Sequence, residues 1–181
     1  SVLMLAFVML FTACGNNNAA NENENVESDE IIIGALGPLT GNVAIYGIAA
    51  TNGTKIAIDE INEAGGILGK QVKLILEDEK GDAQEAMNVY NKLVEDGAVA
   101  IIGDITSGPT LAIADLANRD NMLLITPTGT QLDITEGRPS VFRVAFTDPF
   151  QGRMLAQYAK DTLGASTAGI LANTSNDYSQ G

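Results

Sequence analysis

Short runs of apolar, mostly β-branched residues alternate along this chain with longer segments in which apolar residues recur at helical spacing. The short runs predict strands, and the longer segments between them predict helices. Helices of ten or more residues between strands imply crossover connections, so the strands should run parallel in one α/β sheet. The predicted strands are 31–35, 72–76, 98–102, 122–125, 141–144 and 168–171, and the predicted helices are 45–64, 82–96, 107–118 and 149–163.

Capping and stop residues mark the ends of these helices. Gly65-Gly66 follows the first helical segment and should end it. Asp82, with Glu85 three positions later, resembles a capping box at the start of the second helix. Ser107 is predicted to be the N-cap of the third helix, with Pro109 in its first turn.

The first 13 residues, SVLMLAFVMLFTA, form an apolar run of signal-peptide length. The run is too short to span a bilayer as a helix, which takes about 20 residues. Phe11-Thr12-Ala13-Cys14 resembles the bacterial lipobox, so residues 1–14 are predicted to be a lipoprotein signal peptide with Cys14 as the lipidated residue. The alternative is a lone buried or free thiol. No Met or basic residue precedes the run, and we expect the sequence to begin within a longer one.

Residues 15–30, GNNNAANENENVESDE, are rich in Asn and Glu and contain almost no apolar residue. Such a segment buries too little surface to offset its ordering entropy, so it is predicted to be disordered. Its expected role is a linker that holds the folded body off a membrane.

Composition narrows the function further. The net charge of −13 disfavours nucleic-acid binding, because an acidic surface repels phosphates. The 181 residues contain no histidine, which removes His-based general bases, Ser-His-Asp and Cys-His nucleophiles and most zinc sites. No cofactor, metal or catalytic residue is expected, and the single cysteine forms no intrachain disulfide.

Ligands of parallel α/β sheets bind beyond the carboxyl ends of the strands, which directs attention to the loops there. In the loop 103–109, Ser107 sits where a strand feeds a helix, and free N–H groups and the helix dipole favour an anion such as a carboxylate. Asp104 nearby is expected to oppose a second anion and to suit an ammonium group. The alternative is that Ser107 only caps its own helix.

Two more strand-end loops carry candidate ligand contacts. Thr128 and Thr130 offer hydroxyl and carbonyl groups to an ammonium or a carboxylate, although ordinary turn chemistry explains them as well. The glycine-rich loop 34–41 matches neither G-x-G-x-x-G nor a P-loop, so dinucleotide binding is weakly supported. Tyr46, which follows this loop, is expected either to cover a ligand or to pack in the core.

Taken in order, these loops resemble the type I periplasmic-binding family, and within it the branched-chain amino acid (Leu/Ile/Val) binding proteins of ABC importers. The resemblance runs from residue 31 to residue 181 without a break. Its motifs are Gly37-Pro38-Leu39-Thr40-Gly41, Tyr46-Gly47, Glu60-Ile61-Asn62, Gly65-Gly66-Ile67-Leu68-Gly69, Asp78, Ile102-Gly103, Thr106-Ser107, Thr126-Pro127, Thr130, Val141-Phe142-Arg143, Gln151-Gly152 and Asp177-Tyr178.

The resemblance implies two α/β lobes joined by a hinge, with the ligand enclosed between them. Residues 31–147 would form the first, βαβ lobe with its parallel sheet, and 148–181 the start of a truncated second lobe. By analogy with the family, Ser107 and Thr130 hold the α-carboxylate and α-ammonium groups of an amino acid, with help from the backbone at Thr128. Tyr46 would lie over the ligand and Tyr178 would approach from the second lobe; Thr106 and Ile105 are weaker candidates.

The chain departs from the family at Asp104, which puts the side-chain specificity in doubt, and at Ser179, which replaces a glycine. The expected function is that of an exported, lipid-anchored substrate-binding protein that presents an amino-acid-like solute to an ABC permease in the membrane. A ligand-sensing receptor domain on the same fold remains an alternative. An α/β enzyme is a weaker one, because neither G-x-S-x-G nor histidine is present.

Overall fold

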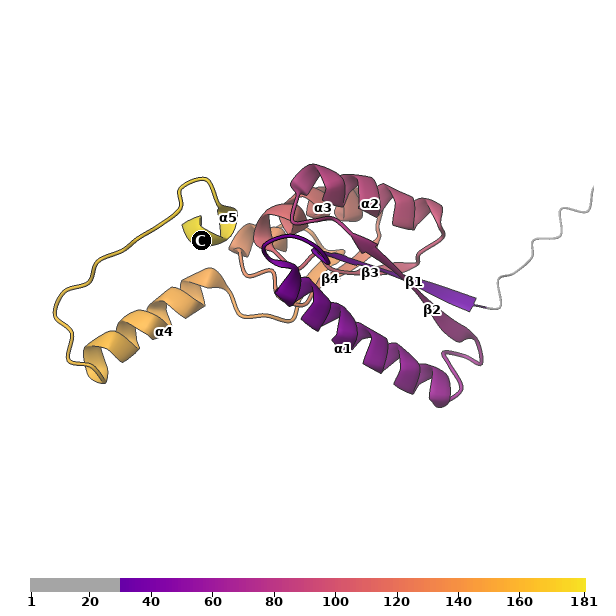
Figure 1. The fold of residues 1–181 in the computed structure, drawn as a ribbon, viewed down its shortest axis with the longest axis horizontal. Coiled ribbons are helices and arrows are strands. Elements are labelled where there is room, and N and C mark those ends of the chain that lie inside the picture. Colours follow the sequence, from indigo (N-terminus) through magenta and orange to yellow (C-terminus); the bar gives the residue numbers. More distant parts are fainter. Residues whose placement is uncertain (1–29) are drawn as a thin grey trace, which may run out of the picture.

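The structure, a computed structural model, describes residues 30–181. The predicted signal peptide at 1–14, its Cys14 and nearly all of the predicted linker at 15–30 lie outside these residues. Figure 1 shows an α/β body, followed by one helix and a returning segment that extend away from it.

One sheet of five parallel strands forms the centre of the body. The strands are β1 (Glu30–Gly37), β2 (Gln71–Asp78), β3 (Ala100–Ile102), β4 (Leu123–Thr126) and β5 (Val141–Arg143), in the order β2-β1-β3-β4-β5. These are the first five predicted strands, and the predicted parallel α/β sheet is confirmed. From β1 the chain passes to β2 on one side and then crosses back to β3 on the other, which opens a crevice at the carboxyl end of β1.

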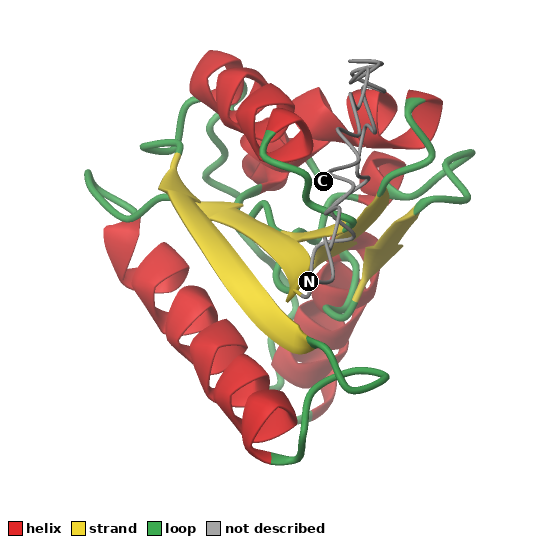
Figure 2. Ribbon diagram, turned by 90° about the vertical axis from the view of Figure 1, so that its right-hand side faces the viewer, coloured by secondary structure: helices red, strands yellow, loops and turns green. Residues whose placement is uncertain are grey.

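Helices cover the two faces of the sheet unequally. α1 (Ala44–Glu63) lies on one face and contacts β1 and β2, whereas α2 (Ala83–Glu95) and α3 (Ser107–Arg119) pack against each other on the opposite face. Figure 1 shows α2 and α3 on one side of the strands and α1 on the other, and Figure 2 shows α1 running along the sheet. No described helix covers β5 on the side of α1, where Phe142 is half exposed.

The main core lies between the sheet and the pair α2–α3. Alternation along the strands directs Leu124 and Val141 into this layer and Phe142 away from it. Tyr90 is fully buried there and its hydroxyl lies 3.0 Å from Asp120 Oδ2, so that burial, together with this hydrogen bond, raises the pKa of Tyr90. The other fully buried side chains of this core include Leu36, Leu93, Ile101, Ile113 and Ile134.

Two of the predicted helix starts can be compared directly with the structure. Asp82 caps α2 as predicted, and its Oδ1 accepts hydrogen bonds from the N–H groups of Gln84 and Glu85, both at 2.9 Å. The prediction for α3 is wrong by one residue: Thr106 is the N-cap, with extended backbone, and Ser107 is the first helical residue. The Ser107 hydroxyl is therefore not used for capping.

The chain beyond β5 forms α4 (Asp148–Asp161) and a short α5 (Asp177–Gln180), and the 3-10 turn η1 (Leu132–Ile134) precedes β5. The helix predicted at 149–163 is confirmed, but the strand predicted at 168–171 is wrong. Ile170 and Leu171 are exposed, and no strand lies alongside them among residues 30–181. A strand needs a neighbour for its backbone hydrogen bonds, so an apolar run alone does not make one.

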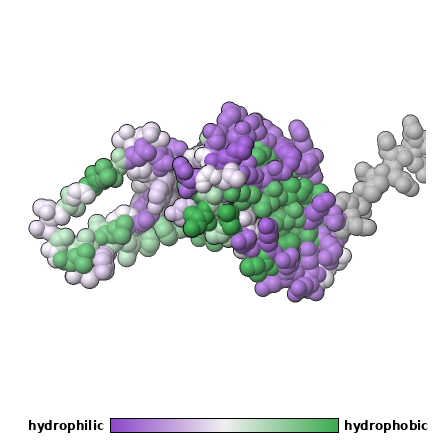
Figure 3. All heavy atoms as spheres, viewed as in Figure 1, coloured by the Kyte–Doolittle hydropathy of each residue, from purple (hydrophilic) through white to green (hydrophobic). Residues whose placement is uncertain are grey.

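Phe150, Met154 and Leu155 are exposed on α4, and Figure 3 shows hydrophobic surface on the part of the chain that extends from the body. Among residues 30–181, no helix has both the length and the apolar character needed to cross a membrane.

We expect Asn62→Ala to lower the free energy of unfolding by about 1–3 kcal/mol. The Asn62 side chain donates to Val72 O at 2.8 Å and accepts from Val72 N at 2.7 Å, which ties the end of α1 to the edge strand β2. Urea unfolding of the complete protein measures the loss. Asn52→Ala, on an exposed position of the same helix, is the control and should cost about 0.5 kcal/mol or less. Equal effects of the two substitutions would contradict this role.

Candidate functional site

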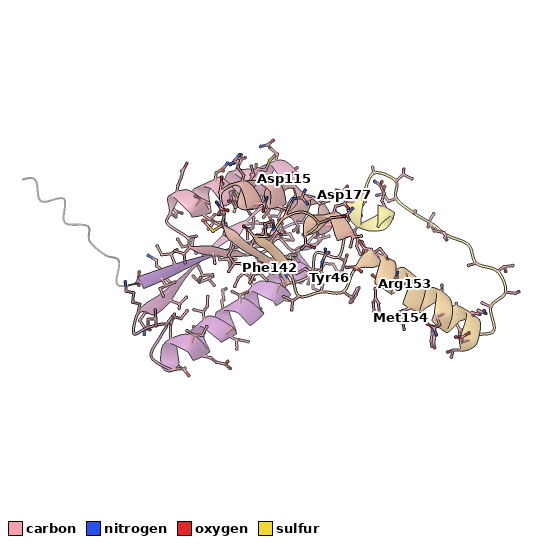
Figure 4. The ribbon with its side chains drawn as sticks, turned by 180° about the vertical axis from the view of Figure 1, so that it is seen from behind. Tyr46, Asp115, Phe142, Arg153, Met154 and Asp177 are labelled. Atoms are coloured by element: carbon pink, nitrogen blue, oxygen red, sulfur yellow. The ribbon has the colours of Figure 1, made fainter. Side chains whose placement is uncertain are left out.

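A cleft of about 750 Å³ opens at the carboxyl ends of the strands, a volume suited to a small-molecule ligand. Its wall combines the starts of α1, α2 and α3, the loop after β4, and α5. All seven predicted ligand contacts line it: Tyr46, Ile105, Thr106, Ser107, Thr128, Thr130 and Tyr178. In Figure 4, Tyr46 on α1 and Asp177 on α5 lie at the end of the body that faces α4.

The start of α3 presents hydrogen-bond donors to this cleft. Ser107 and Gly108 occupy the first turn, and Pro109 has no N–H, so the available backbone donors are those of Ser107 and Gly108. The Ser107 hydroxyl adds a third donor. A 13-residue helix places partial positive charge at this point, which suits a carboxylate.

The loops after β3 and β4 are joined by side-chain hydrogen bonds. Thr126 Oγ1 donates to Asp104 O at 2.5 Å and accepts from Gly129 N at 2.8 Å. Thr128 Oγ1 donates to Ile105 O at 2.5 Å. The Thr128 side chain is therefore engaged within the protein, and its backbone is the part left to contact a ligand.

Thr130 differs from Thr128 in this respect. Its Oγ1 is buried and has no hydrogen-bond partner within the described part of the chain, although it lines the cleft. A buried hydroxyl without a partner is costly, and a ligand polar group would satisfy it.

Tyr46 is held at the cleft by a loop that Asp78 organises. Asp78 Oδ1 accepts from Leu39 N at 2.8 Å, and Oδ2 accepts from Thr40 Oγ1 at 2.6 Å. Partial burial raises the pKa of Asp78, but these hydrogen bonds and one from Lys80 N outweigh it and leave that pKa below its usual range. A Cβ on Gly47 would lie 2.0 Å from Pro38 O, so only glycine lets α1 start this close to the loop.

Asp148, at the start of α4, was missed by the sequence analysis. Its N–H donates to Thr130 O at 3.1 Å, and its carboxylate is buried with no partner for either oxygen among the described residues. The partly buried Arg143 does not pair with it, because its guanidinium donates to the carbonyls of Gln131 and Leu132 and to other neutral oxygens. Burial lowers the pKa of Arg143, and the Asp148 charge opposes this.

Sequence alone offered no signal for Asp148 as a contact, because an acidic residue in the first turn is ordinary for any helix. Asp148 is buried beside Thr130 and does not itself line the cleft, whereas the lining residues that were not predicted include Asp82, Phe146, Asn176 and Asp177. Asp177 approaches α3 closely, and a Cβ on Gly108 would lie 3.0 Å from its Oδ2.

Asp104, whose negative charge was expected to suit an ammonium group, does not reach the cleft. Asp104 is fully buried and does not line the cleft, because its side chain turns back to accept hydrogen bonds from the N–H groups of Ile105 and Thr106. Burial raises the pKa of Asp104 well above its usual range, and the charge of Glu79 raises it further. Among residues 30–181, no three His, Cys, Asp or Glu side chains cluster in a way that could hold a metal ion.

Comparison with curated proteins finds amino-acid-binding proteins. The chain is 40% identical over 130 residues to the Leu/Ile/Val-binding protein BraC3 of Rhizobium johnstonii, which covers 71% of this chain and 35% of that protein. It is 33% identical over 148 residues to the leucine-, isoleucine-, valine-, threonine- and alanine-binding protein of Pseudomonas aeruginosa, covering 81% of this chain and 40% of the relative.

Solved structures of substrate-binding proteins also match. The branched-chain amino acid transporter substrate-binding protein LivJ of Streptococcus pneumoniae, in complex with isoleucine, matches with a TM-score of 0.80 and 36% identity over 83% of this chain and 44% of that one. The leucine-binding protein LivK of Thermotoga maritima matches with a TM-score of 0.78 and 34% identity over 83% of this chain and 43% of that one. The chain thus spans less than half the length of these proteins.

The matched region contains the whole described body and its cleft. The family model for periplasmic binding proteins covers residues 30–181, which include every strand and helix of the structure. The architecture agrees with the type I periplasmic-binding fold of the solved relatives, of which this chain carries a part. On the family model and these relatives together, the chain belongs to the periplasmic binding protein family.

Proposed function

We propose that this chain carries the first lobe, residues 31–147, and the beginning of the second lobe, residues 148–181, of an ABC importer's substrate-binding protein. It would capture a small amino-acid-like solute, branched-chain or related, outside the cytoplasm and hand it to a membrane permease without catalysing a reaction. The observation that carries the proposal is that Ser107 and Thr130 line one cleft, while the carboxylate of Asp148, whose N–H donates to Thr130 O, is buried next to Thr130 without a partner among the described residues.

The ligand's carboxylate would bind at the start of α3. The Ser107 and Gly108 N–H groups and the Ser107 hydroxyl would supply up to three donors, and the helix dipole adds favourable charge. Ser107 is the first helical residue and not the cap, so its hydroxyl is not already committed to the helix.

The ammonium group would bind at Thr130, with the buried carboxylate of Asp148 behind it. An ammonium group has three donors and no acceptor, so it needs oxygen partners. Thr130 Oγ1 and both Asp148 carboxylate oxygens are buried acceptors without a partner among the described residues. A cation there would remove the cost of burying an unpaired carboxylate.

Closure of the two lobes would complete the site. α5, which carries Tyr178, already lies across the cleft from Ser107 and contacts α3. A ligand that contacts both sides would stabilise the closed arrangement, and such hinge closure is a known device of periplasmic binding proteins. The permease would then bind the closed form.

Export and anchoring form a separate part of the proposal, based on the sequence before residue 30. The apolar run ends at Cys14, and the Asn- and Glu-rich segment that follows suits a tether. We propose a lipoprotein anchored through Cys14 on the outer face of the cell membrane, which places the cleft where external solute is available.

We expect Ser107→Ala to weaken the binding of L-isoleucine by the complete protein about 10- to 100-fold, because a hydrogen bond to a charged group contributes about 1.5–3 kcal/mol. Calorimetric titration measures the change. Ser140→Ala is the matched control, because Ser140 precedes β5 at the amino end of the sheet, away from the cleft. Unchanged affinity in Ser107→Ala would overturn the carboxylate site, and failure of every α-amino acid to bind would overturn the function.

Asp148→Asn should weaken isoleucine binding about 10-fold or more, because it removes the charge opposite the ammonium group. The same substitution should leave the weak binding of 3-methylpentanoate, which lacks the ammonium group, unchanged or improved. Titrations of both ligands with wild type, Asp148→Asn and the exposed control Asp161→Asn at the other end of α4 test this. An equal loss for both ligands would show that Asp148 acts on the fold and not on the ammonium group.

Cys14→Ala should release the protein from the membrane into the soluble fraction and abolish incorporation of a palmitate analogue. Fractionation and metabolic labelling of cells that express the complete gene measure both effects. Because Cys14 is the only cysteine in this sequence, Thr12→Ala serves as the neighbouring control. Membrane retention and labelling of Cys14→Ala at wild-type levels would contradict the anchor.

A further inference from the structure

Two acidic side chains are buried behind the floor of the cleft. Glu79 follows β2 and Asp104 follows β3, and neither side chain is exposed to solvent. Since β1 lies between β2 and β3 in the sheet, the two residues flank the end of β1. Neither of them lines the cleft, so the contacts proposed above make no use of them.

Each carboxyl group uses one oxygen and leaves the other without a partner. Glu79 Oε2 accepts from Asp82 N at 2.9 Å, and Asp104 Oδ1 accepts from Ile105 N and Thr106 N. Glu79 Oε1 and Asp104 Oδ2 are buried and have no hydrogen-bond partner in the described part of the chain. Burying both carboxyl groups in the ionised form would cost much free energy, because each would keep one charged oxygen without a hydrogen-bond partner.

The charges that act on the pair are acidic. The negative charges of Asp78 and Asp82, which lie on the same loop, raise the pKa of Glu79, and the charge of Glu79 raises the pKa of Asp104. The carboxyl ends of β1 and β4 and the first two turns of α3 carry no ionisable side chain. The other charged residues nearby are Lys80, which follows Glu79, Glu85 in the first turn of α2, and Asp177 on α5.

Burial dominates the ionisation of both groups. It raises the pKa of Glu79 to about 7, with smaller contributions from Asp78 and Asp82 against hydrogen bonds from Gly81 and Asp82. It raises the pKa of Asp104 well above the usual range, and the Glu79 charge adds to this. Like-charged neighbours titrate as a pair, so at neutral pH the pair holds at least one proton.

The position of this pair bears directly on the proposed carboxylate site. Asp104 immediately precedes Ile105, Thr106 and Ser107, all of which line the cleft. An ionised pair behind this loop would repel the anion that the start of α3 attracts. A neutral Asp104 still accepts hydrogen bonds from the loop and adds no negative charge.

We propose that Glu79 and Asp104 are positioning residues that together retain at least one proton, so that Asp104 holds the backbone of Ile105 and Thr106 while the region behind the cleft stays neutral enough for a ligand carboxylate to bind. The inference rests on the proposed function. By reciprocity, carboxylate binding favours protonation of the pair, so the complete protein takes up protons as it binds ligand and loses affinity as the pair ionises.

Calorimetric titration of the complete protein with L-isoleucine between pH 5.5 and 8.5 tests this linkage. The zwitterion of isoleucine does not titrate over that range. We expect the dissociation constant to rise about tenfold from pH 6 to pH 8.5. At pH 7.5, the binding enthalpies measured in phosphate and in Tris should differ, because the buffer releases the protons that the protein takes up and the two buffers have different enthalpies of ionisation. The sign of the difference should correspond to net proton uptake.

Glu79→Gln should flatten the pH profile and abolish the buffer difference, and Asp104→Asn should retain binding because it mimics the neutral acid. Glu95→Gln, exposed on α2, should behave as wild type. Equal enthalpies in the two buffers with a flat wild-type profile would overturn the inference, as would a profile in Glu79→Gln identical to that of wild type.

The ligand-free protein gives a readout that is independent of the proposed function. A group whose pKa is higher in the folded state than in the unfolded state stabilises the fold less as pH rises between the two values, here from 4.5 to about 7. The melting temperature of Glu79→Gln should therefore increase relative to wild type from pH 4.5 to pH 8. Failure of isoleucine to bind would contradict the proposed function. Separately, a difference in melting temperature between Glu79→Gln and wild type that does not change with pH would overturn the inference about the pair.

Discussion

The crossing of the chain from one side of β1 to the other is the constraint on which the rest of the structure depends. α1 leads from β1 to β2 on one face, and α2 leads from β2 back to β3 on the opposite face. The loops after β1 and β3 must then diverge, so the crevice between them cannot be closed by either helix. The starts of three helices meet at this crevice, and the cleft follows from the connection of the strands and not from any one side chain.

The loops around the crevice are held in place before any ligand binds. Asp78 fixes the loop that leads to Tyr46, and Thr126 and Thr128 fix the loop that leads to Ser107. These hydrogen bonds join segments that are 22 to 39 residues apart in the sequence. Such preorganisation reduces the entropy that the binding of a ligand would have to overcome.

Much of this site was predicted from two arguments: ligands of parallel α/β sheets bind beyond the carboxyl ends of the strands, and the loops there resemble those of a known family. The first five strands, the parallel sheet and the four longer helices were all predicted, and the seven expected contacts line one cleft. The strand at 168–171 failed because an apolar run cannot show whether a neighbouring strand exists. The N-cap of α3 was predicted one residue too late, because Thr106 and Ser107 are both capping residue types and only the backbone angles show that Thr106 is the cap.

The sequence by itself determined the order and type of the elements, because apolar periodicity and helix-stop residues are local properties. It also identified the loops that meet at the cleft. Only the tertiary structure decided which polar atoms remain without partners there. From the sequence, the charge of Asp104 was expected to suit an ammonium group, but the side chain is buried behind the cleft. Asp148 looked like an ordinary residue at a helix start, but its carboxylate is left without a partner beside Thr130 among the described residues. Burial and pairing depend on contacts between distant segments, and these exist only once the sheet has brought the segments together.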